Sequence, residues 1–156
     1  MRTPRVYLET TLFNYYFDKD RDAHADTVKL FNEIKAGKYK AFTSGAVIEE
    51  LEEAPEEKYT AMFALIERYD ISVLSISEDI DKLAEIYVTE GIIPQRFRTD
   101  GIHIAVAAVN NLDIIISLNF RHIVKKKTID GTGKINEEQG YKRVEIFSPI
   151  MLIEEE

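Results

Sequence analysis

The sequence of 156 residues contains no cysteine at all. Without cysteine, the protein cannot form disulfides, thiolate zinc sites or cysteine nucleophiles, so any bound metal must take oxygen or imidazole ligands. No stretch approaches the roughly 20 consecutive apolar residues that a membrane-spanning helix needs. The N-terminal segment MRTPRVYLE also lacks the apolar core of a secretory signal. We therefore expect no membrane partner and a cytoplasmic location.

Proline and glycine are scarce, with 4 and 7 residues, whereas 45% of the residues are hydrophobic and 31% are charged. This composition argues against disorder and provides enough apolar surface for one good core. We therefore expect a single domain over 1–156. The formal net charge of −8 would repel a polyanion as a whole. A nucleic-acid partner would have to be held by local basic patches.

The hydrophobic pattern predicts strands that alternate with helices. Short β-branched, aromatic or apolar runs predict strands at 5–8, 39–43, 71–76, 114–117 and 143–147. Helical spacing predicts helices from about residue 12, over 22–36, from Ser44 to Pro55, over 58–69, from Ser77 to about 90, and over 100–109. The stretch 125–140 is expected to be a loop. The alternation predicts an α/β fold, a three-layer α/β/α sandwich around a mainly parallel sheet of about five strands.

Acidic residues occur where such a fold binds ligands, beyond the carboxyl ends of its strands. Glu9 is the first polar residue after strand 5–8, although a solvated strand-end acid would occupy the same place. In the run of glutamates that follows Ser44, Glu50 lies nearest the apolar stripe of the helix, with a small margin over Glu52. The default interpretation of that run is a solvated helix face.

Asp100 opens the apolar helix 100–109, where it could act as an N-cap or as a site residue. His103 lies on the same face and could ligate a metal together with Asp100. A lone histidine on a buried helix is more often a hydrogen-bonded core residue. The strand 114–117 is followed by Asn119, and Asp113 precedes that strand, so we expect Asp113 at the opposite edge of the sheet.

Three carboxylates at one sheet edge would form a hard-oxygen site suited to Mg²⁺ or Mn²⁺. Such ions activate water and offset the charge that develops on a phosphate during hydrolysis. Glu9, Glu50 and Asp100 are therefore candidate metal ligands. Phosphodiester hydrolysis is the chemistry that this set of residues favours.

Four segments together resemble the PIN domain family: VYLETT at 6–11, TSGAVIEEL at 43–51, TDGIHIA at 99–105 and ISLNFRHI at 116–123. The resemblance covers essentially the whole chain and is greatest to the prokaryotic toxin ribonucleases of toxin–antitoxin pairs. It implies an endoribonuclease that depends on Mg²⁺ or Mn²⁺ and acts on RNA. It also implies a parallel five-stranded sheet, an antitoxin protein as a partner and a homodimer.

By this resemblance, Glu9 takes the place of the first-strand acid of the family, which is usually Asp, and Thr11 that of the small hydroxyl residue after it. Glu50 matches the acid of the third helix and Asp100 the acid that opens the central helix. Asn119 stands where many members have a fourth acid. The implied catalytic residues are thus Glu9, Glu50, Asp100 and Asn119, with Thr11 in support.

Cations flank two of the proposed site positions, and we expect them to hold RNA phosphates. These residues are Arg96, Arg98, Arg121, Lys125, Lys126 and Lys127. They could equally be solvated loop charges.

Several other functions find little or no support in the sequence. The segment DGTGK at 130–134 is not a phosphate-binding P-loop, which needs Gly at Thr128 and Ser or Thr at Ile135, and it is expected to be a turn. No serine-hydrolase elbow or zinc-protease helix is present. Two alternatives stay open: a catalytically silent module that binds RNA or protein, and a small-molecule phosphohydrolase that uses Asp100, His103 and His122.

Overall fold

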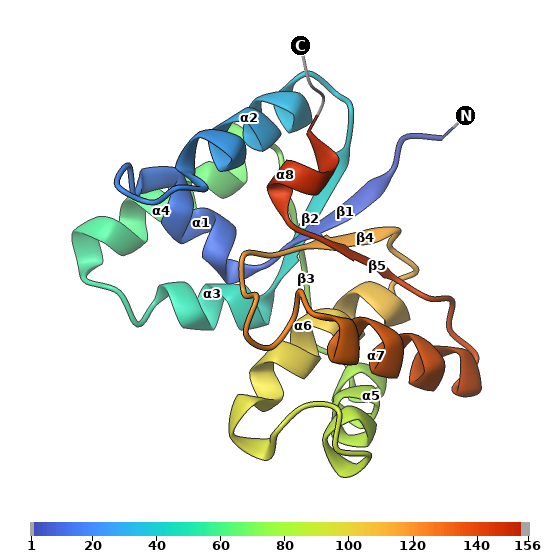
Figure 1. Cartoon of the computed structure of the whole chain (residues 1–156). Helices are drawn as coiled ribbons and strands as arrows, with labels where there is room; N and C mark the ends of the chain where they lie inside the picture. The colour runs from blue at the N-terminus through green and yellow to red at the C-terminus, as the bar shows by residue number, and fades with distance from the viewer. Residues whose placement is uncertain (1, 154–156) are drawn as a thin grey trace.

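The computed structural model describes residues 2–153 as a parallel β-sheet with helices on both sides (Figure 1). The strands are β1 (Arg5–Leu8), β2 (Lys40–Ser44), β3 (Ser72–Leu74), β4 (Ile114–Ile116) and β5 (Glu145–Phe147). The helices are α1 (Thr10–Phe17), α2 (His24–Lys35), α3 (Gly45–Leu51), α4 (Glu56–Arg68), α5 (Glu78–Thr89), the 3-10 helix η1 (Gln95–Phe97), α6 (Arg98–Val109), α7 (Lys126–Glu138) and α8 (Pro149–Leu152).

The five strands form one sheet in the order β3-β2-β1-β4-β5, and every neighbouring pair is parallel. The chain adds β2 and β3 on one side of β1 and then crosses back to add β4 and β5 on the other side. The strand order therefore reverses between β1 and β4. Ligands bind at such a switch point in open α/β sheets.

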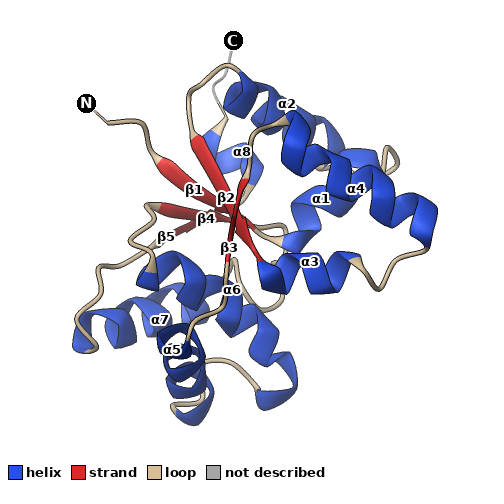
Figure 2. Ribbon diagram, turned by 180° about the vertical axis from the view of Figure 1, so that it is seen from behind, coloured by secondary structure: helices blue, strands red, loops and turns tan. Residues whose placement is uncertain are grey.

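Helices cover both faces of the sheet, which confirms the predicted three-layer arrangement. One face carries α1, α2, α4 and α8, and the other carries α5, α6 and α7 (Figure 2). Helix α3 lies at the end of the sheet, where it contacts α1 and α4 on one side and α6 on the other. Helix α3 can thus bring a side chain toward α6 at the carboxyl ends of the strands.

The centre of the core consists of the two strands at the switch point and helix α6. Val6, Tyr7 and Leu8 of β1 are inaccessible to solvent, as are Ile115 and Ile116 of β4. Parallel strands buried on both faces favour such uninterrupted apolar runs. Most of α6 is enclosed as well, which is why its sequence is apolar on nearly all sides.

The stretch 125–140 forms helix α7, so the predicted loop and the predicted turn at 130–134 are wrong. The sequence contains few apolar residues there because small and polar side chains form the buried side of the helix. These are Thr128, Thr132, Gly133 and Asn136, and the apolar Ile135 is buried beside them. Thr132 donates its hydroxyl hydrogen to the backbone oxygen of Thr128, one turn earlier, at 2.7 Å. The buried hydroxyl is satisfied within the helix itself, so it carries no penalty for burial.

No helix in residues 2–153 combines the length and the apolar content that crossing a bilayer requires.

Candidate functional site

Glu9 directly follows β1 and is buried at the carboxyl edge of the sheet, as its sequence position predicted. Its Oε1 atom accepts hydrogen bonds from the Thr11 hydroxyl at 2.6 Å, the Thr11 backbone N–H at 3.3 Å and the Ser117 hydroxyl at 2.7 Å. Ser117 directly follows β4, so these contacts join the ends of the two strands at the switch point. Three donors on one oxygen hold the carboxylate in a single orientation.

Thr11 also contacts the segment that follows β4. Its hydroxyl oxygen accepts the backbone N–H of Leu118 at 2.9 Å while the hydroxyl donates to Glu9. The supporting role that the sequence resemblance implied for Thr11 thus has a physical basis, because the side chain connects the first acid to the chain near Asn119.

Glu50 is the one glutamate of the 49–53 run that turns toward the site. It is half-buried, whereas Glu49, Glu52 and Glu53 are exposed. Its Oε1 atom accepts the hydroxyl hydrogen of Thr10 at 2.7 Å and lies 2.6 Å from Nε2 of His103.

Burial alone would raise the pKa of Glu50, but the hydrogen bond and charge of His103 outweigh it, with help from the Thr10 hydroxyl, and lower the pKa. Glu50 is therefore ionised at neutral pH.

His103 is completely buried and connects the acidic residues to the core. Burial opposes its protonation, but the hydrogen bond to Glu50 and the charges of Glu9, Glu50 and Asp100 raise the pKa of His103 above its ordinary value. A protonated ring donates from both nitrogens, here to Glu50 and to the Tyr7 hydroxyl 2.6 Å from Nδ1.

The Tyr7 hydroxyl continues this chain of contacts to Ser44, at 2.7 Å. The sequence left open whether His103 is a metal ligand or a hydrogen-bonded core residue, and the structure supports the core residue.

Asp100 lies in the first turn of α6, whose N-cap residue is Phe97, so the sequence alternative in which Asp100 caps this helix is wrong. Burial is the main cause that raises the pKa of Asp100 to about 6. The charge of His103 is the largest opposing effect, the charges of Glu9 and Glu50 add to the rise, and the Asn119 hydrogen bond lowers the pKa slightly. Asn119 donates its side-chain N–H to Asp100 Oδ1 at 3.3 Å. The three predicted acids therefore lie close enough to repel one another.

The three acids lie near His103, but their side chains are not arranged as the ligands of one metal ion. Among residues 2–153, no three histidine, aspartate or glutamate side chains are arranged so that they could hold one metal ion. The hydrogen bonds of Glu9 and Glu50 involve one oxygen of each carboxylate, which accepts from Thr11 and Ser117 in Glu9 and from Thr10 and His103 in Glu50. Their donor chemistry still fits a hard cation, since all three groups offer carboxylate oxygens and crowded carboxylates gain from a positive charge.

The predicted RNA-binding cations divide into two groups. Arg98 forms ion pairs with Asp81 and Glu85 of α5, at 3.6 and 3.2 Å, and Lys126 pairs with Asp130 within α7 at 2.6 Å. The other four have no carboxylate partner in the described part of the chain: Arg96, Arg121, Lys125 and Lys127. These four are the better candidates for phosphate contacts.

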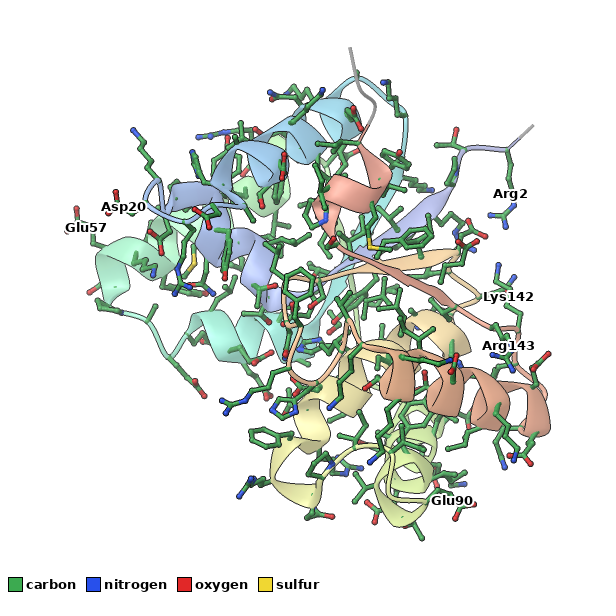
Figure 3. All side chains as sticks on the ribbon, viewed as in Figure 1. Arg2, Asp20, Glu57, Glu90, Lys142 and Arg143 are labelled. Carbon is green, nitrogen blue, oxygen red and sulfur yellow. The ribbon has the colours of Figure 1, made fainter. Side chains whose placement is uncertain are left out.

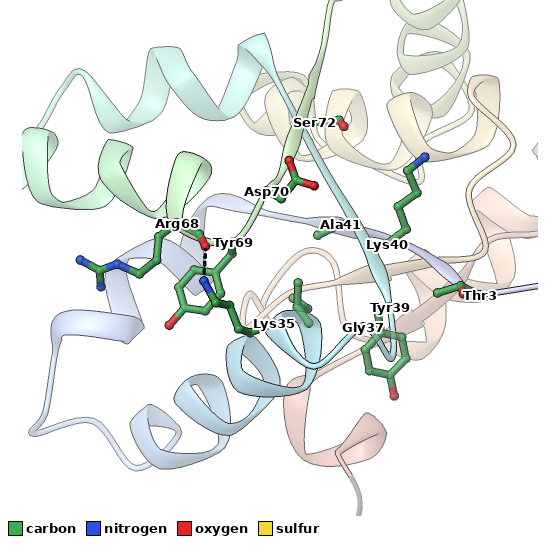
Figure 4. Close-up of a pocket in the computed structure, with 11 residues that line it drawn as sticks. Thr3, Lys35, Gly37, Tyr39, Lys40, Ala41, Arg68, Tyr69, Asp70 and Ser72 are labelled. Carbon is green, nitrogen blue, oxygen red and sulfur yellow. Dashed lines mark hydrogen bonds between the residues drawn. The ribbon is translucent and has the colours of Figure 1, made fainter.

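Asp113 lies at the opposite edge of the sheet, as predicted from its position before β4. Its carboxylate accepts hydrogen bonds from the backbone N–H of Arg5 and from the side chains of Arg2 and Lys142. Figure 3 shows the side chains of Arg2 and Lys142 pointing toward one another. A cavity of about 560 Å³ also opens at that edge, beside the start of β2 at Lys40 (Figure 4). None of the predicted site residues lines it, so it is separate from the acidic cluster.

Sequence reasoning missed Thr10, Ser117, Tyr7 and Ser44. Thr10 and Ser117 carried a usable signal, because both are hydroxyl residues at the carboxyl ends of strands that the fold prediction made neighbours. Tyr7 carried none, since an aromatic residue in a buried strand looks like any other core residue. In the alternative phosphohydrolase site, the two histidine rings have different partners, because the His122 ring stacks on Phe97, at 3.9 Å between ring centroids, while His103 contacts Tyr7 and Glu50.

Comparison with known proteins identifies relatives of this fold. The family model described as PIN domain matches residues 6–127. None of the curated proteins matches the sequence. Among solved structures, the chain is similar to Mycobacterium tuberculosis VapC20, described as a sarcin-ricin loop cleaving toxin, with a TM-score of 0.60 and 13% identity over 90% of this chain and 98% of that one. It is also similar to a chain of VapBC2 from Rickettsia felis bound to a promoter DNA fragment, with a TM-score of 0.57 and 12% identity over 92% of this chain and 98% of that one.

Proposed function

The chain belongs to the PIN domain family, and from this premise we propose that it is a metal-dependent endoribonuclease that hydrolyses RNA phosphodiester bonds. One observation carries the proposal: Glu9, Glu50 and Asp100 gather around His103 at the point where the strand order reverses. Burial, with the two other carboxylates, raises the pKa of Asp100 to about 6 even though the charge of His103 lowers it. Acidic crowding of this kind destabilises a site that holds no cation.

Glu9, Glu50 and Asp100 are the residues that would hold Mg²⁺ or Mn²⁺. When bound, such an ion supplies positive charge that offsets the charge developing on the phosphate and lowers the pKa of water. Carboxylate oxygens suit both ions better than zinc or copper. In residues 2–153, Glu9 Oε2 and Asp100 Oδ2 accept no side-chain hydrogen bond, so each acid has a free oxygen.

The neighbouring residues position these acids. Thr11 and Ser117 orient Glu9, Thr10 and His103 orient Glu50, and Asn119 orients Asp100. In hydrolysis, the oxygen of a water molecule forms the new bond to phosphorus, the bond to the leaving sugar oxygen breaks, and that oxygen takes up a proton. Preorganised carboxylates favour this reaction because they need not reorient when the charge develops.

The proposal is tested by manganese-dependent cleavage of assorted RNAs. We expect wild type to cut and Asp100→Asn to cut at least about 100-fold more slowly, because removing a direct ligand costs more than removing a supporting one. Asp113→Asn is the matched control, since it changes the same residue type at the opposite edge of the sheet. No cleavage by wild type, or equal cleavage by wild type and Asp100→Asn, would contradict the nuclease function.

A second candidate function is a catalytically silent module that binds RNA or protein. It is favoured by the neutral Asn119, which lies beside Asp100 and offers no carboxylate. The side chain of Asn119 is already engaged, because its oxygen accepts the His122 backbone N–H at 3.0 Å while its amide donates to Asp100. RNA binding without cleavage under any divalent metal would support this module over the enzyme.

We also propose that the protein is the cytoplasmic toxin of a toxin–antitoxin pair, that it binds an antitoxin protein and that it forms a homodimer. The fold shared with VapC20, a toxin, supports this assignment. Coexpression with the product of a small adjacent reading frame should yield a stable complex and suppress toxicity. Light scattering on the isolated protein should give twice the mass of one chain, 18.0 kDa. A monomeric protein would contradict the homodimer, and a protein that is harmless on expression would contradict the toxin.

A further inference from the structure

The cavity beside the start of β2 lies at the edge of the sheet opposite the acidic residues. Its volume of about 560 Å³ is within the range of roughly 300–1,000 Å³ that small-molecule sites occupy. The loop between α2 and β2 and the segment between α4 and β3 border it (Figure 4). Because β2 runs from Lys40 to Ser44, its two ends are separated by roughly 13 Å at about 3.3 Å per residue. A ligand in this cavity would therefore not touch the acidic residues.

Part of the cavity wall is apolar. Ile34 of α2, Ala41 of β2 and Tyr69 after α4 line it, and they are only 6%, 2% and 8% exposed. The hydroxyl of Tyr69 is already hydrogen-bonded to that of Tyr16 at 2.7 Å. A wall of this kind favours contact with the apolar or aromatic part of a ligand.

Two lysines line the same cavity. Nζ of Lys35 donates to the backbone oxygen of Arg68 at 3.1 Å, which leaves two of its three hydrogens for another acceptor (Figure 4). Nζ of Lys40 lies 5.8 Å from the centroid of the Phe42 ring. Neither lysine has a carboxylate partner in the described part of the chain. Two ammonium groups match a phosphate monoester, which carries about −1.5 to −2 charges at pH 7.

Asp70 adds a hydrogen-bond acceptor to the cavity. It is exposed and forms no ion pair with any cation of residues 2–153. In the view of Figure 4, its carboxylate lies between the ends of Lys35 and Lys40. The acid and the two lysines thus line one cavity without pairing with one another. A carboxylate beside a phosphate site can accept a hydrogen bond from a ribose hydroxyl, as the acid of dinucleotide sites does.

We propose that this cavity binds a nucleoside monophosphate. Lys35 and Lys40 donate hydrogen bonds to the phosphate, Asp70 accepts one from a ribose hydroxyl, and the base contacts the apolar wall. An inorganic anion would use the lysines alone and would meet the negative charge of Asp70. The inference goes beyond the proposed nuclease function and does not rest on it, because it uses none of the acidic residues at the other edge.

Calorimetric titration in EDTA tests the site, because EDTA keeps metal ions from binding the phosphate at the acidic edge. Adenosine monophosphate should bind wild type more tightly than ribose phosphate, which lacks the base. Lys40→Gln should weaken this binding at least about 10-fold, as expected for the loss of a hydrogen bond from a charged group. Lys19→Gln is the matched control, because Lys19 is exposed and has no ion-pair partner among residues 2–153.

Asp70→Gly separates a nucleotide site from a site for any small anion. The φ of Asp70 is 52°, a conformation that glycine adopts readily, so the variant should fold. Loss of the acceptor should weaken binding of adenosine monophosphate about 10-fold. Binding of inorganic phosphate should instead become tighter, because a negative charge has been removed. Asp22→Gly removes the same charge from an exposed turn and should change neither affinity.

Amide NMR spectra of wild type locate the bound nucleotide. Adenosine monophosphate should shift the resonances of residues 39–41 and 69–72 and leave those of residues 117–119 unchanged. Shifts confined to residues 117–119 would place the nucleotide at the acidic edge and overturn the proposal.

The affinities can overturn the proposal as well. Wild type that binds no adenosine monophosphate at millimolar concentration would do so, as would Lys40→Gln that binds it as tightly as wild type. Ribose phosphate that binds as tightly as adenosine monophosphate would exclude the contact with the base. Tighter binding of both phosphate compounds by Asp70→Gly would indicate a site for any small anion.

Discussion

Nε2 of His103 lies 2.6 Å from Oε1 of Glu50, so a completely buried imidazole holds one acid of the surface site. The direction of both pKa shifts favours the charged pair, since the pKa of His103 is raised and that of Glu50 is lowered. The position of Glu50 consequently depends on the packing of α6 against the sheet. A substitution in the core behind His103 should therefore change the position of Glu50 in the site.

The first prediction concerns the Tyr7 hydroxyl, which contacts both His103 and Ser44. Tyr7→Phe leaves two buried polar groups without this partner and should lower the free energy of unfolding by about 2 kcal/mol. Urea denaturation measures the change. Tyr16→Phe is the control, because the Tyr16 hydroxyl forms a partly buried hydrogen bond with that of Tyr69, and its loss should cost about 1 kcal/mol or less. Equal losses would mean that the buried chain of contacts adds no more stability than the Tyr16–Tyr69 hydrogen bond does.

The second prediction is that Asp100→Asn stabilises the protein in EDTA. The raised pKa of about 6 means that folding disfavours the ionised form of Asp100. Its contribution to stability is thus full below the ordinary pKa of about 3.8 and is lost as pH rises through 6. Above pH 7 the variant should be more stable by about 1–3 kcal/mol, and the difference should vanish near pH 4. A variant that is less stable than wild type at pH 7.5 would contradict the buried, crowded carboxylate.

The strand ends and the central helix could be predicted from the sequence because their signals are local. Continuous apolar runs gave β1 and β4, and a polar residue directly after a run placed Glu9 at the edge of the sheet. Helical phase separated Glu50 from the exposed glutamates around it. These features depend on neighbours in the chain and need no knowledge of packing.

Helix α7 and the partners of the acids could not be predicted in the same way. The buried side of α7 includes Thr128 and Thr132, whose hydroxyls are satisfied by backbone oxygens, so its apolar stripe is interrupted. The Ser117 contact with Glu9 spans 108 residues and exists only because β1 and β4 are neighbours. Likewise, Arg98 looked like a free cation until α5 brought Asp81 and Glu85 beside it.

The third prediction uses Asp113 at the opposite edge of the sheet. Burial would raise its pKa, but hydrogen bonds from Lys142, the Arg5 backbone and Arg2 lower it to about 2. This stabilisation is present above the ordinary pKa of 3.8 and is lost as pH falls toward 2. Asp113→Asn should cost about 1 kcal/mol at pH 7, after allowance for solvent screening, and nothing near pH 2.

Denaturation curves at several pH values test this dependence. Asp22→Asn is a suitable control, because the exposed Asp22 has no ion-pair partner among residues 2–153. A loss for Asp113→Asn that stays constant from pH 7 to pH 2 would indicate a purely steric effect.

The last prediction concerns metal binding by the acids. Mg²⁺ or Mn²⁺ at about 100 times its dissociation constant should stabilise wild type by roughly 2.7 kcal/mol, which raises Tm by about 5–10 °C for a chain of this size. Glu9→Gln and Glu50→Gln keep most of the side-chain volume but lose a charged ligand, so their Tm should rise less. Glu52→Gln removes the same charge from an exposed position beside Glu50 and should respond like wild type. An equal rise in Tm in all four proteins would place the bound ion elsewhere. At the acidic site the ion stabilises the protein by offsetting the repulsion between carboxylates, and this effect needs the charges of Glu9 and Glu50.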